Sequence, residues 1–230
     1  MKQKILVVDI GGTHVKLMIS PDEKLKFDSG LALSPKQLVE AIKETAAVWD
    51  YDAVALGFPS PVTKGKITKD PKNLAKGWVG YDFEKSLGKP TRVINDAAMQ
   101  ALGSYHGGRM LFLGLGTGLG STLVWDENVL PLELGDLPYG DGATIEDHLG
   151  KRGLENFGKK IWQREVLTAV TQLKIAFIAD YVVLGGGNVK QLKELPDGIE
   201  AGHNRHAYLG GCRLWETESK TRADKWKIIS

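Results

Sequence analysis

The sequence predicts an α/β protein of two lobes around a central cleft. A β-rich apolar run enters a glycine-rich turn twice, at Asp9-Ile-Gly-Gly-Thr13 and at Gly114-Leu-Gly-Thr-Gly118-Leu-Gly120. A second apolar run leaves each turn, so each turn closes a hairpin instead of opening a helix. Two hairpins roughly a hundred residues apart indicate an internal duplication with a ligand between the halves, a description that the actin-like phosphotransferase architecture fits.

The two turns have the chemistry of a phosphate site. The P-loop pattern requires Gly-Lys-Ser/Thr after its second glycine, and the dinucleotide-binding pattern requires a helix after its third; neither is present. Exposed backbone N–H groups at a glycine turn can approach a phosphate because no Cβ blocks them. Glycine-rich hairpin turns are also common without a ligand, so a structural role explains either turn alone equally well. The pair, with Asp9 at the end of one strand, favours phosphate binding.

The remaining elements alternate between helix and strand. Ser34-Pro-Lys-Gln37 has an N-cap, an N1 proline and a capping-box partner, and apolar residues follow at helical spacing. Residues 53–57 are a buried strand, after which Pro59-Ser-Pro61 forces an irregular loop. Beyond it we expect a loop at 63–81, a strand at 91–94, a helix that starts at Asn95-Asp96 and ends at Gly103, a helix at about 159–174, a strand at 181–184, a short helix ending at Pro196 and a helix at 207–215.

Composition narrows the function classes. The 230 residues are enough for two small lobes with a core, and the net charge of +2 gives no strong field for nucleic acid or membrane surfaces. The single cysteine, Cys212, excludes an intrachain disulfide framework and a thiolate zinc cluster. No secretory leader or transmembrane stretch is expected. These features predict a cytoplasmic protein with no nucleic-acid and no membrane partner.

The chemistry concentrates on Asn95-Asp96, at the junction of a strand and a helix. Backbone N–H groups at such a junction would hold the Asp96 carboxylate in place and keep it ionised. Phosphoryl transfer needs an oriented hydroxyl, an acceptor for its proton and positive groups around the phosphoryl oxygens. Asp96 could accept the proton and Asn95 could hold a neighbouring hydroxyl. The alternative is that Asp96 is simply the helix N-cap, and both roles are compatible.

At these residues the sequence resembles the ROK family of sugar kinases, most of all the branch with bacterial polyphosphate glucokinases. The resemblance spans nearly the whole chain, and its segments are specific in this order although several are weak alone. They are Asp9-Ile-Gly-Gly-Thr-His-Val-Lys16, Gly57-Phe-Pro59-Ser-Pro61-Val with Gly65, Asn73-Leu with Gly77-Trp78, Asn95-Asp96-Ala, Gly116-Thr-Gly118-Leu-Gly120, Glu133-Leu-Gly135 and Gly185-Gly-Gly187.

The resemblance implies an actin-like ATPase (ribonuclease H-like) duplicated fold and a set of site residues. It makes Asp96 the catalytic base. Sugar hydroxyls would be held by Asn95, Glu133 and Glu146, with Gly57 and Pro59 in the sugar-side loop. The phosphoryl donor would lie against Asp9, Gly11, Gly12, Thr13, Lys16, Gly116, Thr117 and Gly118, with Gly185, Gly186 and Gly187 at the far end of its cleft. Mg²⁺ is the implied cofactor, and Asp9 is a candidate indirect ligand for it.

Asp136 is a departure from the family pattern. Most members have a histidine here, after Glu-x-Gly, which contacts the sugar and in many members helps to bind a structural zinc with nearby cysteines. Cysteines are absent from this region, so no structural zinc of that kind is expected. Aspartate can accept a hydroxyl proton but cannot donate one at neutral pH, so the sugar hydroxyl beside Asp136 must donate. Substrate choice, and activity itself, are therefore left open.

Three other features have ordinary explanations as well as functional ones. His203 and His206 have the spacing of some metal pairs but no suitable third ligand, which favours surface or cleft histidines. Trp78 could stack on a sugar, and a packed loop tryptophan is the alternative. The lysine-rich loop from Lys64 to Lys76 is either a solvated face or a guide for a long polyanion, which would favour polyphosphate as donor.

The sequence thus predicts a kinase that transfers a phosphoryl group from polyphosphate or ATP to a hexose, most simply glucose at C6. Residues 1–106 would form the small lobe and residues 107–230 the larger one, with the final helix packing back on the small lobe. A homodimer is expected from the resemblance. The alternatives are a sensor that binds sugar without catalysis, a kinase for another hexose such as N-acetylmannosamine, and an ATPase without a sugar site. A DNA-binding regulator is disfavoured because no helix-turn-helix segment precedes the first hairpin.

Overall fold

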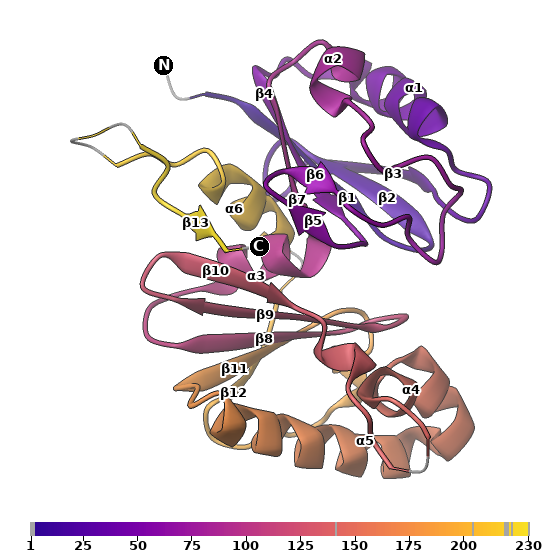
Figure 1. The fold of residues 1–230 in the computed structure, drawn as a ribbon, viewed down its shortest axis with the longest axis vertical. Helices are drawn as coiled ribbons and strands as arrows, with labels where there is room; N and C mark the ends of the chain where they lie inside the picture. Colours follow the sequence, from indigo (N-terminus) through magenta and orange to yellow (C-terminus); the bar gives the residue numbers. More distant parts are fainter. Residues whose placement is uncertain (1–2, 141, 204, 219–220, 222, 230) are drawn as a thin grey trace.

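Two mixed β-sheets, with helices on both sides of each, form the body of the protein (Figure 1). The structure is a computed structural model that describes residues 3–140, 142–203, 205–218, 221 and 223–229. The strand order is β3-β2-β1-β4-β7 in the first sheet and β12-β11-β8-β9-β10-β13 in the second, and β5 and β6 form a separate hairpin. The predicted α/β class with two sheets is confirmed.

The first sheet places the ends of three parallel strands at one edge. Its strands are β1 (Ile5–Ile10), β2 (His14–Met18), β3 (Lys24–Asp28), β4 (Ala53–Phe58) and β7 (Thr91–Asn95). β1 and β2 are antiparallel and close the first glycine turn, whereas β4 runs parallel to both β1 and β7. Asp9 is opposite Gly57, and Phe58 is opposite Asn95. Residues from three separate parts of the chain therefore meet at this edge.

The second sheet repeats this arrangement. Its strands are β8 (Met110–Leu115), β9 (Leu119–Trp125), β10 (Asn128–Leu132), β11 (Tyr181–Gly185), β12 (Ile199–Ala201) and β13 (Lys227–Ile228). β8 and β9 form the antiparallel hairpin around the second glycine turn, and β11 runs parallel to β8 with Gly185 opposite Gly114. Each sheet thus has a glycine hairpin with a parallel strand beside its first strand, which is the duplication that the paired motifs predict.

Two helices, α3 (Asp96–Ser104) and α6 (Arg205–Arg213), lie between the sheets (Figure 1). They share one buried core with side chains from both sheets, including Val7, Phe112 and Val183. A Cβ added to Gly103 would overlap the backbone of α6, so the two helices touch through their main chains. The division of the chain into lobes at residue 106 stays a prediction, because this shared core joins the two sheets.

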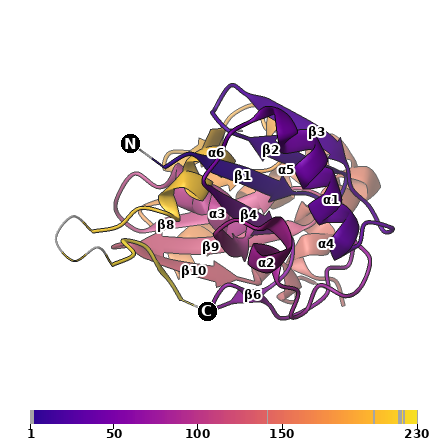
Figure 2. The same ribbon diagram turned by 90° about the horizontal axis from the view of Figure 1, so that it is seen from above.

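The other helices cover the outer faces. α1 (Pro35–Thr45) and α2 (Phe83–Leu87) lie over the first sheet (Figure 2), and the predicted capping box of Ser34 and Gln37 is present at α1. α4 (Ile145–Leu149) and α5 (Lys151–Ala176) pack on the second sheet. Within the described ranges, no helix is both long and apolar enough to cross a lipid bilayer.

Several element boundaries differ from the prediction. The expected loop at 63–81 contains the short hairpin of β5 (Val62–Thr63) and β6 (Lys66–Ile67). The helix expected from about 159 begins at Lys151 and is interrupted at Gly158, where φ is 73°. The helix expected before Pro196 is only a 3₁₀ turn, Val189–Gln191. Val189, Leu192 and Leu195 nevertheless pack on the core. The described residues contain two further 3₁₀ turns, Ala46–Val48 and Leu134–Asp136.

Candidate active site

The first glycine turn is held by hydrogen bonds that leave two backbone donors unused. The Gly11 N–H donates to the His14 carbonyl at 3.0 Å, and the Ser29 hydroxyl donates to the Gly11 carbonyl at 2.6 Å. Within the described residues, the N–H groups of Gly12 and Thr13 donate to no protein atom. Two adjacent N–H groups without partners are the arrangement in which a main-chain turn binds an anion.

Asp9 and Lys16 face each other across this hairpin. The strand register pairs the two residues, and Lys16 Nζ lies 3.5 Å from Asp9 Oδ2. Burial raises the pKa of Asp9, and the Lys16 ammonium acts in the opposite direction. The Lys16 side chain is half exposed while Asp9 is buried, so the pair presents a positive charge next to the turn.

The second turn, at Gly116–Gly118, has the same property. The Gly116 N–H donates within the turn, to the carbonyls of Gly114 and Gly118, both at 3.1 Å. The Gly116 carbonyl in turn accepts from the Lys151 N–H at 3.1 Å. For Thr117 and Gly118, no partner of the N–H group occurs in the part of the chain that the structure describes. Both hairpins therefore offer a pair of free main-chain donors.

Glu146, on α4, holds the backbone that follows the second turn. Its Oε2 accepts from the Leu119 N–H at 3.1 Å, and a Cβ on Gly118 would overlap the same carboxylate. Its Oε1 lies 3.9 Å from Lys72 Nζ. One oxygen of Glu146, a predicted sugar-binding residue, is therefore bonded to the backbone next to the turn. The other oxygen faces Lys72 of the loop between β6 and α2.

The glycines after β11 pack against the second turn. Gly186 has φ of 85°, and a Cβ there would overlap the Leu115 carbonyl. Asn188 fixes the contact, because its N–H donates to Leu115 and its Nδ2 donates to Gly116, both at 3.0 Å. The fold therefore joins Gly185–Gly187 to the second turn, and sequence reasoning missed Asn188, which follows the glycines directly.

Asn95, not Asp96, caps α3. The Asn95 side-chain oxygen accepts from the Ala98 N–H at 3.1 Å, and its Nδ2 donates to the Ser60 carbonyl at 3.5 Å. Asp96 is the first residue of the helix, and its Oδ1 accepts from the Ala97 N–H at 2.8 Å. The alternative in which Asp96 is only a cap is therefore wrong, and Asn95 is oriented by both the helix and the proline loop.

The surroundings of Asp96 work against its expected ionisation. Burial, with the negative charge of Asp9 second, raises the pKa of Asp96 from 3.8 to about 7. The Ala97 N–H opposes this rise, and Glu133 adds to it. Asp96 is still half-buried rather than sealed from solvent. A carboxyl group with a pKa near neutrality, fixed at the start of a helix, has the properties of a general base.

Two glycines allow α3 to approach both sheets. A Cβ on Gly57 would overlap the end of the Met99 side chain, and a Cβ on Gly120 would lie 2.6 Å from that of Ala97. The first turn of α3, which carries Asp96, therefore lies close to β4 and β9. Pro59 begins the loop directly after β4, and the Ser60 hydroxyl in this loop donates to the Lys69 carbonyl at 2.6 Å.

The acidic segment after β10 adds two carboxylates. Glu133 precedes a 3₁₀ turn, and the Asp136 N–H donates to its carbonyl at 3.2 Å. Partial burial of its carboxyl group raises the pKa of Glu133, although the residue as a whole is exposed. The charge of Asp136 raises it further and that of Lys69 lowers it. Glu133 also raises the pKa of Asp96, so Asp96, Glu133, Asp136 and Lys69 lie near one another.

Other candidates lie elsewhere. Trp78 is fully buried and packs on Phe58 and Phe83, which is the packed-loop alternative. His206 Nδ1 lies 2.7 Å from the Ser104 hydroxyl, inside the contact between α3 and α6.

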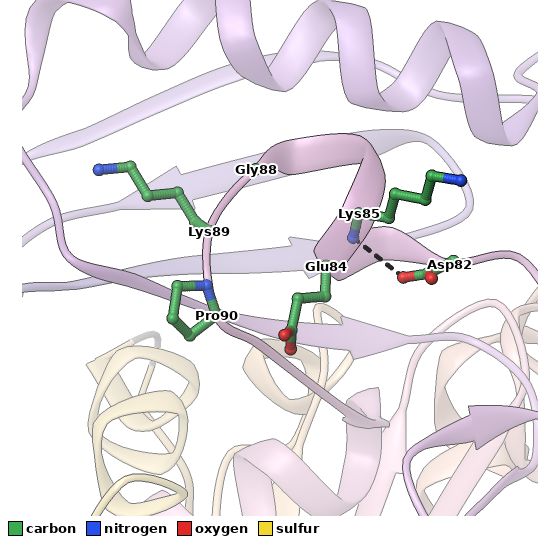
Figure 3. Close-up of a pocket in the computed structure, with 6 residues that line it drawn as sticks. All are labelled: Asp82, Glu84, Lys85, Gly88, Lys89 and Pro90. Atoms are coloured by element: carbon green, nitrogen blue, oxygen red, sulfur yellow. Dashed lines mark hydrogen bonds between the residues drawn. The ribbon is translucent and has the colours of Figure 1, made fainter.

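Two cavities of the structure are open depressions, one away from the site and one that borders Ser29 beside the first glycine turn. One, of about 580 Å³, lies at the end of α2 and is lined by Asp82, Glu84, Lys85, Gly88, Lys89 and Pro90 (Figure 3). The other, of about 470 Å³, lies between β3 and α1. The convergence of hydrogen bonds and charges at the glycine turns, rather than the size of a depression, therefore identifies the site.

The fold and site together define an actin-like α/β protein with a pair of glycine hairpins, one in each sheet. The chain belongs to the ROK family, whose sequence profile matches residues 5–131. It is 22% identical to a polyphosphate glucokinase of Mycobacterium leprae over 203 residues, which are 78% of this chain and 62% of that protein. The chain thus spans less than two thirds of that relative.

Solved structures of the family share the fold. The inorganic polyphosphate/ATP-glucomannokinase of Arthrobacter sp. strain KM superimposes with a TM-score of 0.78 at 24% identity, over 91% of this chain and 97% of that one. A ROK family glucokinase from Streptomyces griseus, in complex with glucose and AMPPNP, has a TM-score of 0.71 at 16% identity, over 92% and 98% of the two chains. The actin-like fold is therefore confirmed.

Proposed function

We propose that this protein is a sugar kinase that transfers a phosphoryl group from polyphosphate or ATP to the C6 hydroxyl of a hexose, with glucose as the first candidate. The observation that carries the proposal is the position of Asp96 at the start of α3, beside Gly57, whose strand partner is Asp9 of the first hairpin. Burial and the charge of Asp9 raise the pKa of Asp96 to about 7. The names of the mycobacterial and Arthrobacter relatives support polyphosphate and ATP as donors, and the Streptomyces griseus complex supports glucose.

The reaction would use the residues as follows. The ionised Asp96 carboxylate accepts the proton of the sugar hydroxyl while the hydroxyl oxygen forms a bond to the terminal phosphorus of the donor. The bond from that phosphorus to the bridging oxygen breaks, and the shortened donor leaves with the electron pair. The free N–H groups of the two glycine turns hold donor oxygens in line with the sugar.

Magnesium fits this site through Asp9. Among the described residues no cluster of three or more metal-ligating side chains occurs, so an ion would depend on donor oxygens and water besides a carboxylate. Asp9 is buried beside the free N–H groups of the first turn, where it could hold such an ion through water. When bound, magnesium would neutralise charge on the donor phosphates. Lys16 supplies a further positive charge at that place.

The sugar would be held by Asn95, Glu133, Asp136 and Glu146. The Nδ2 group of Asn95 makes only a long hydrogen bond to Ser60, which a sugar hydroxyl could replace. The Asp136 carboxylate can only accept hydrogen bonds, so we expect it to accept one from the C2 hydroxyl and thereby to affect affinity for the sugar. A 2-deoxy sugar should lose affinity relative to its parent sugar, and equal kinetics for the two sugars would refute this role.

The test is a matrix of donors and acceptors. Purified protein with Mg²⁺ is incubated with glucose, mannose, N-acetylmannosamine or fructose and with ATP or polyphosphate, and sugar phosphates are measured. Asp96→Asn should lower turnover by about 10²-fold to 10⁴-fold while sugar affinity, measured by calorimetry, stays within a few fold. Unchanged turnover in this variant would remove Asp96 from the mechanism. No product with any pair would favour a sugar sensor over a kinase.

A further inference from the structure

Two adjacent residues of the loop between β6 and α2 contact both glycine turns. The Asn73 side chain lies against the first turn, since a Cβ on Gly12 would be 3.5 Å from Asn73 Nδ2. Lys72 reaches the other side, where its Nζ lies 3.9 Å from Glu146 Oε1, directly below the second turn. The loop therefore bridges the two hairpins through Asn73 and Lys72. The ammonium of Lys72 places a positive charge beside the second hairpin.

The charges around the site explain why a cation is needed at this place. Asp9, Asp96, Glu133, Asp136 and Glu146 all lie near the two turns, and burial first and like charges second raise the pKa of Asp96 and of Glu133. These carboxylates would repel a polyanionic phosphoryl donor unless a positively charged side chain lay among them.

Among the lysines of the described residues, Lys16 faces Asp9 at the first turn and Lys69 acts on Glu133. Lys72 is the one paired with Glu146 at the second turn.

The ion pair of Lys72 with Glu146 is weak enough for a phosphate group to replace Glu146 as the partner of Lys72. The Lys72 side chain is 72% exposed and that of Glu146 is 37% exposed, and the charged atoms are 3.9 Å apart. Exposed ion pairs with such geometry contribute little to stability. A phosphate oxygen near the free N–H groups of Thr117 and Gly118 would offer the ammonium a stronger partner.

We propose that Lys72 is a positioning residue for the phosphoryl group in transfer, held by Glu146 until the donor binds and then drawn to the terminal phosphate. This inference rests on the proposed kinase function and adds a residue to its site. The ammonium would offset charge on the equatorial oxygens while Asp96 takes the proton from the sugar.

The kinetic test compares Lys72→Met with Lys66→Met, a control that removes an exposed lysine of the neighbouring strand β6. Lys72→Met should lower kcat/KM for the donor by about 10-fold to 100-fold and leave KM for the sugar unchanged, whereas Lys66→Met should change neither. Lys72→Arg keeps the charge and should recover most of the loss. Equal kinetics for the two methionine variants, or a loss that Lys72→Arg does not recover, would overturn the assignment.

A binding test separates this inference from the proposed function. Tripolyphosphate is titrated into wild-type protein and into both methionine variants by calorimetry, without sugar, and urea unfolding verifies that all three are folded. At least a fivefold weaker affinity in Lys72→Met alone supports the assignment even if no sugar is phosphorylated, a result that would remove only the kinase proposal. Equal affinities in the three proteins, or no binding by the wild type, would overturn it.

Discussion

The raised pKa of Asp96 makes a quantitative prediction about stability. In the unfolded chain this carboxyl group ionises near 3.8, and in the folded protein its pKa is about 7. Between these values the folded state keeps a proton that the unfolded state has released, so the free energy of unfolding falls as pH rises through this window. The pKa difference corresponds to about 4 kcal/mol. Relaxation around an ionised Asp96 would reduce this, so we expect a loss of about 2 to 4 kcal/mol.

Asp96→Asn removes the ionisation and isolates its effect. The difference in free energy of unfolding between this variant and wild type should be small near pH 4, grow as pH rises, and level off above about pH 7 with the variant more stable. Urea unfolding at closely spaced pH values measures it, with Asp197→Asn as an exposed control. A difference that stays constant within about 0.5 kcal/mol across this range would refute the raised pKa.

Three further predictions follow from the same structure. Because Asp96 must be ionised to act as a base, kcat/KM should rise about tenfold per pH unit below about pH 7 and level off above it; a flat profile would contradict this role. Gly210→Ala would drive a Cβ into the Met99 carbonyl and should cost about 3 kcal/mol or more in thermal unfolding, whereas Gly187→Ala, with open space around its Cβ, should cost far less. Trp78→Phe should lower stability by about 1 to 3 kcal/mol and leave KM for the sugar unchanged, and a large change in KM would indicate that Trp78 contacts the sugar.

The hairpins and the strand-to-helix junction could be predicted because their signals are local. A glycine turn between two apolar runs specifies a hairpin from a few neighbouring residues, and Asn95-Asp96 marks a helix start in the same way. The choice of cap could not be predicted, since both residues are good caps. It depends on the backbone: Asn95 has φ of −59° and ψ of 142°, outside the helical region, and so occupies the cap.

The electrostatics of the site depend on contacts between distant segments. Backbone hydrogen bonds alone would lower the pKa of Asp96, and this local effect was the basis of the sequence prediction. Burial between the sheets and the charge of Asp9 outweigh it. The ion pair of Lys72 with Glu146 has the same origin, since the lysine loop suggested a polyanion guide but nothing local indicates which lysine reaches the second turn.

The main-chain contact of α3 with α6 has a mechanical consequence. At Gly103 no side chain separates the two backbones, and an added Cβ would overlap the His206 carbonyl, so the helices cannot slide past each other there. Asp96 is carried by α3, a helix held at its other end by this contact, and not by a loop. The proton acceptor of the proposed reaction therefore has a rigid support.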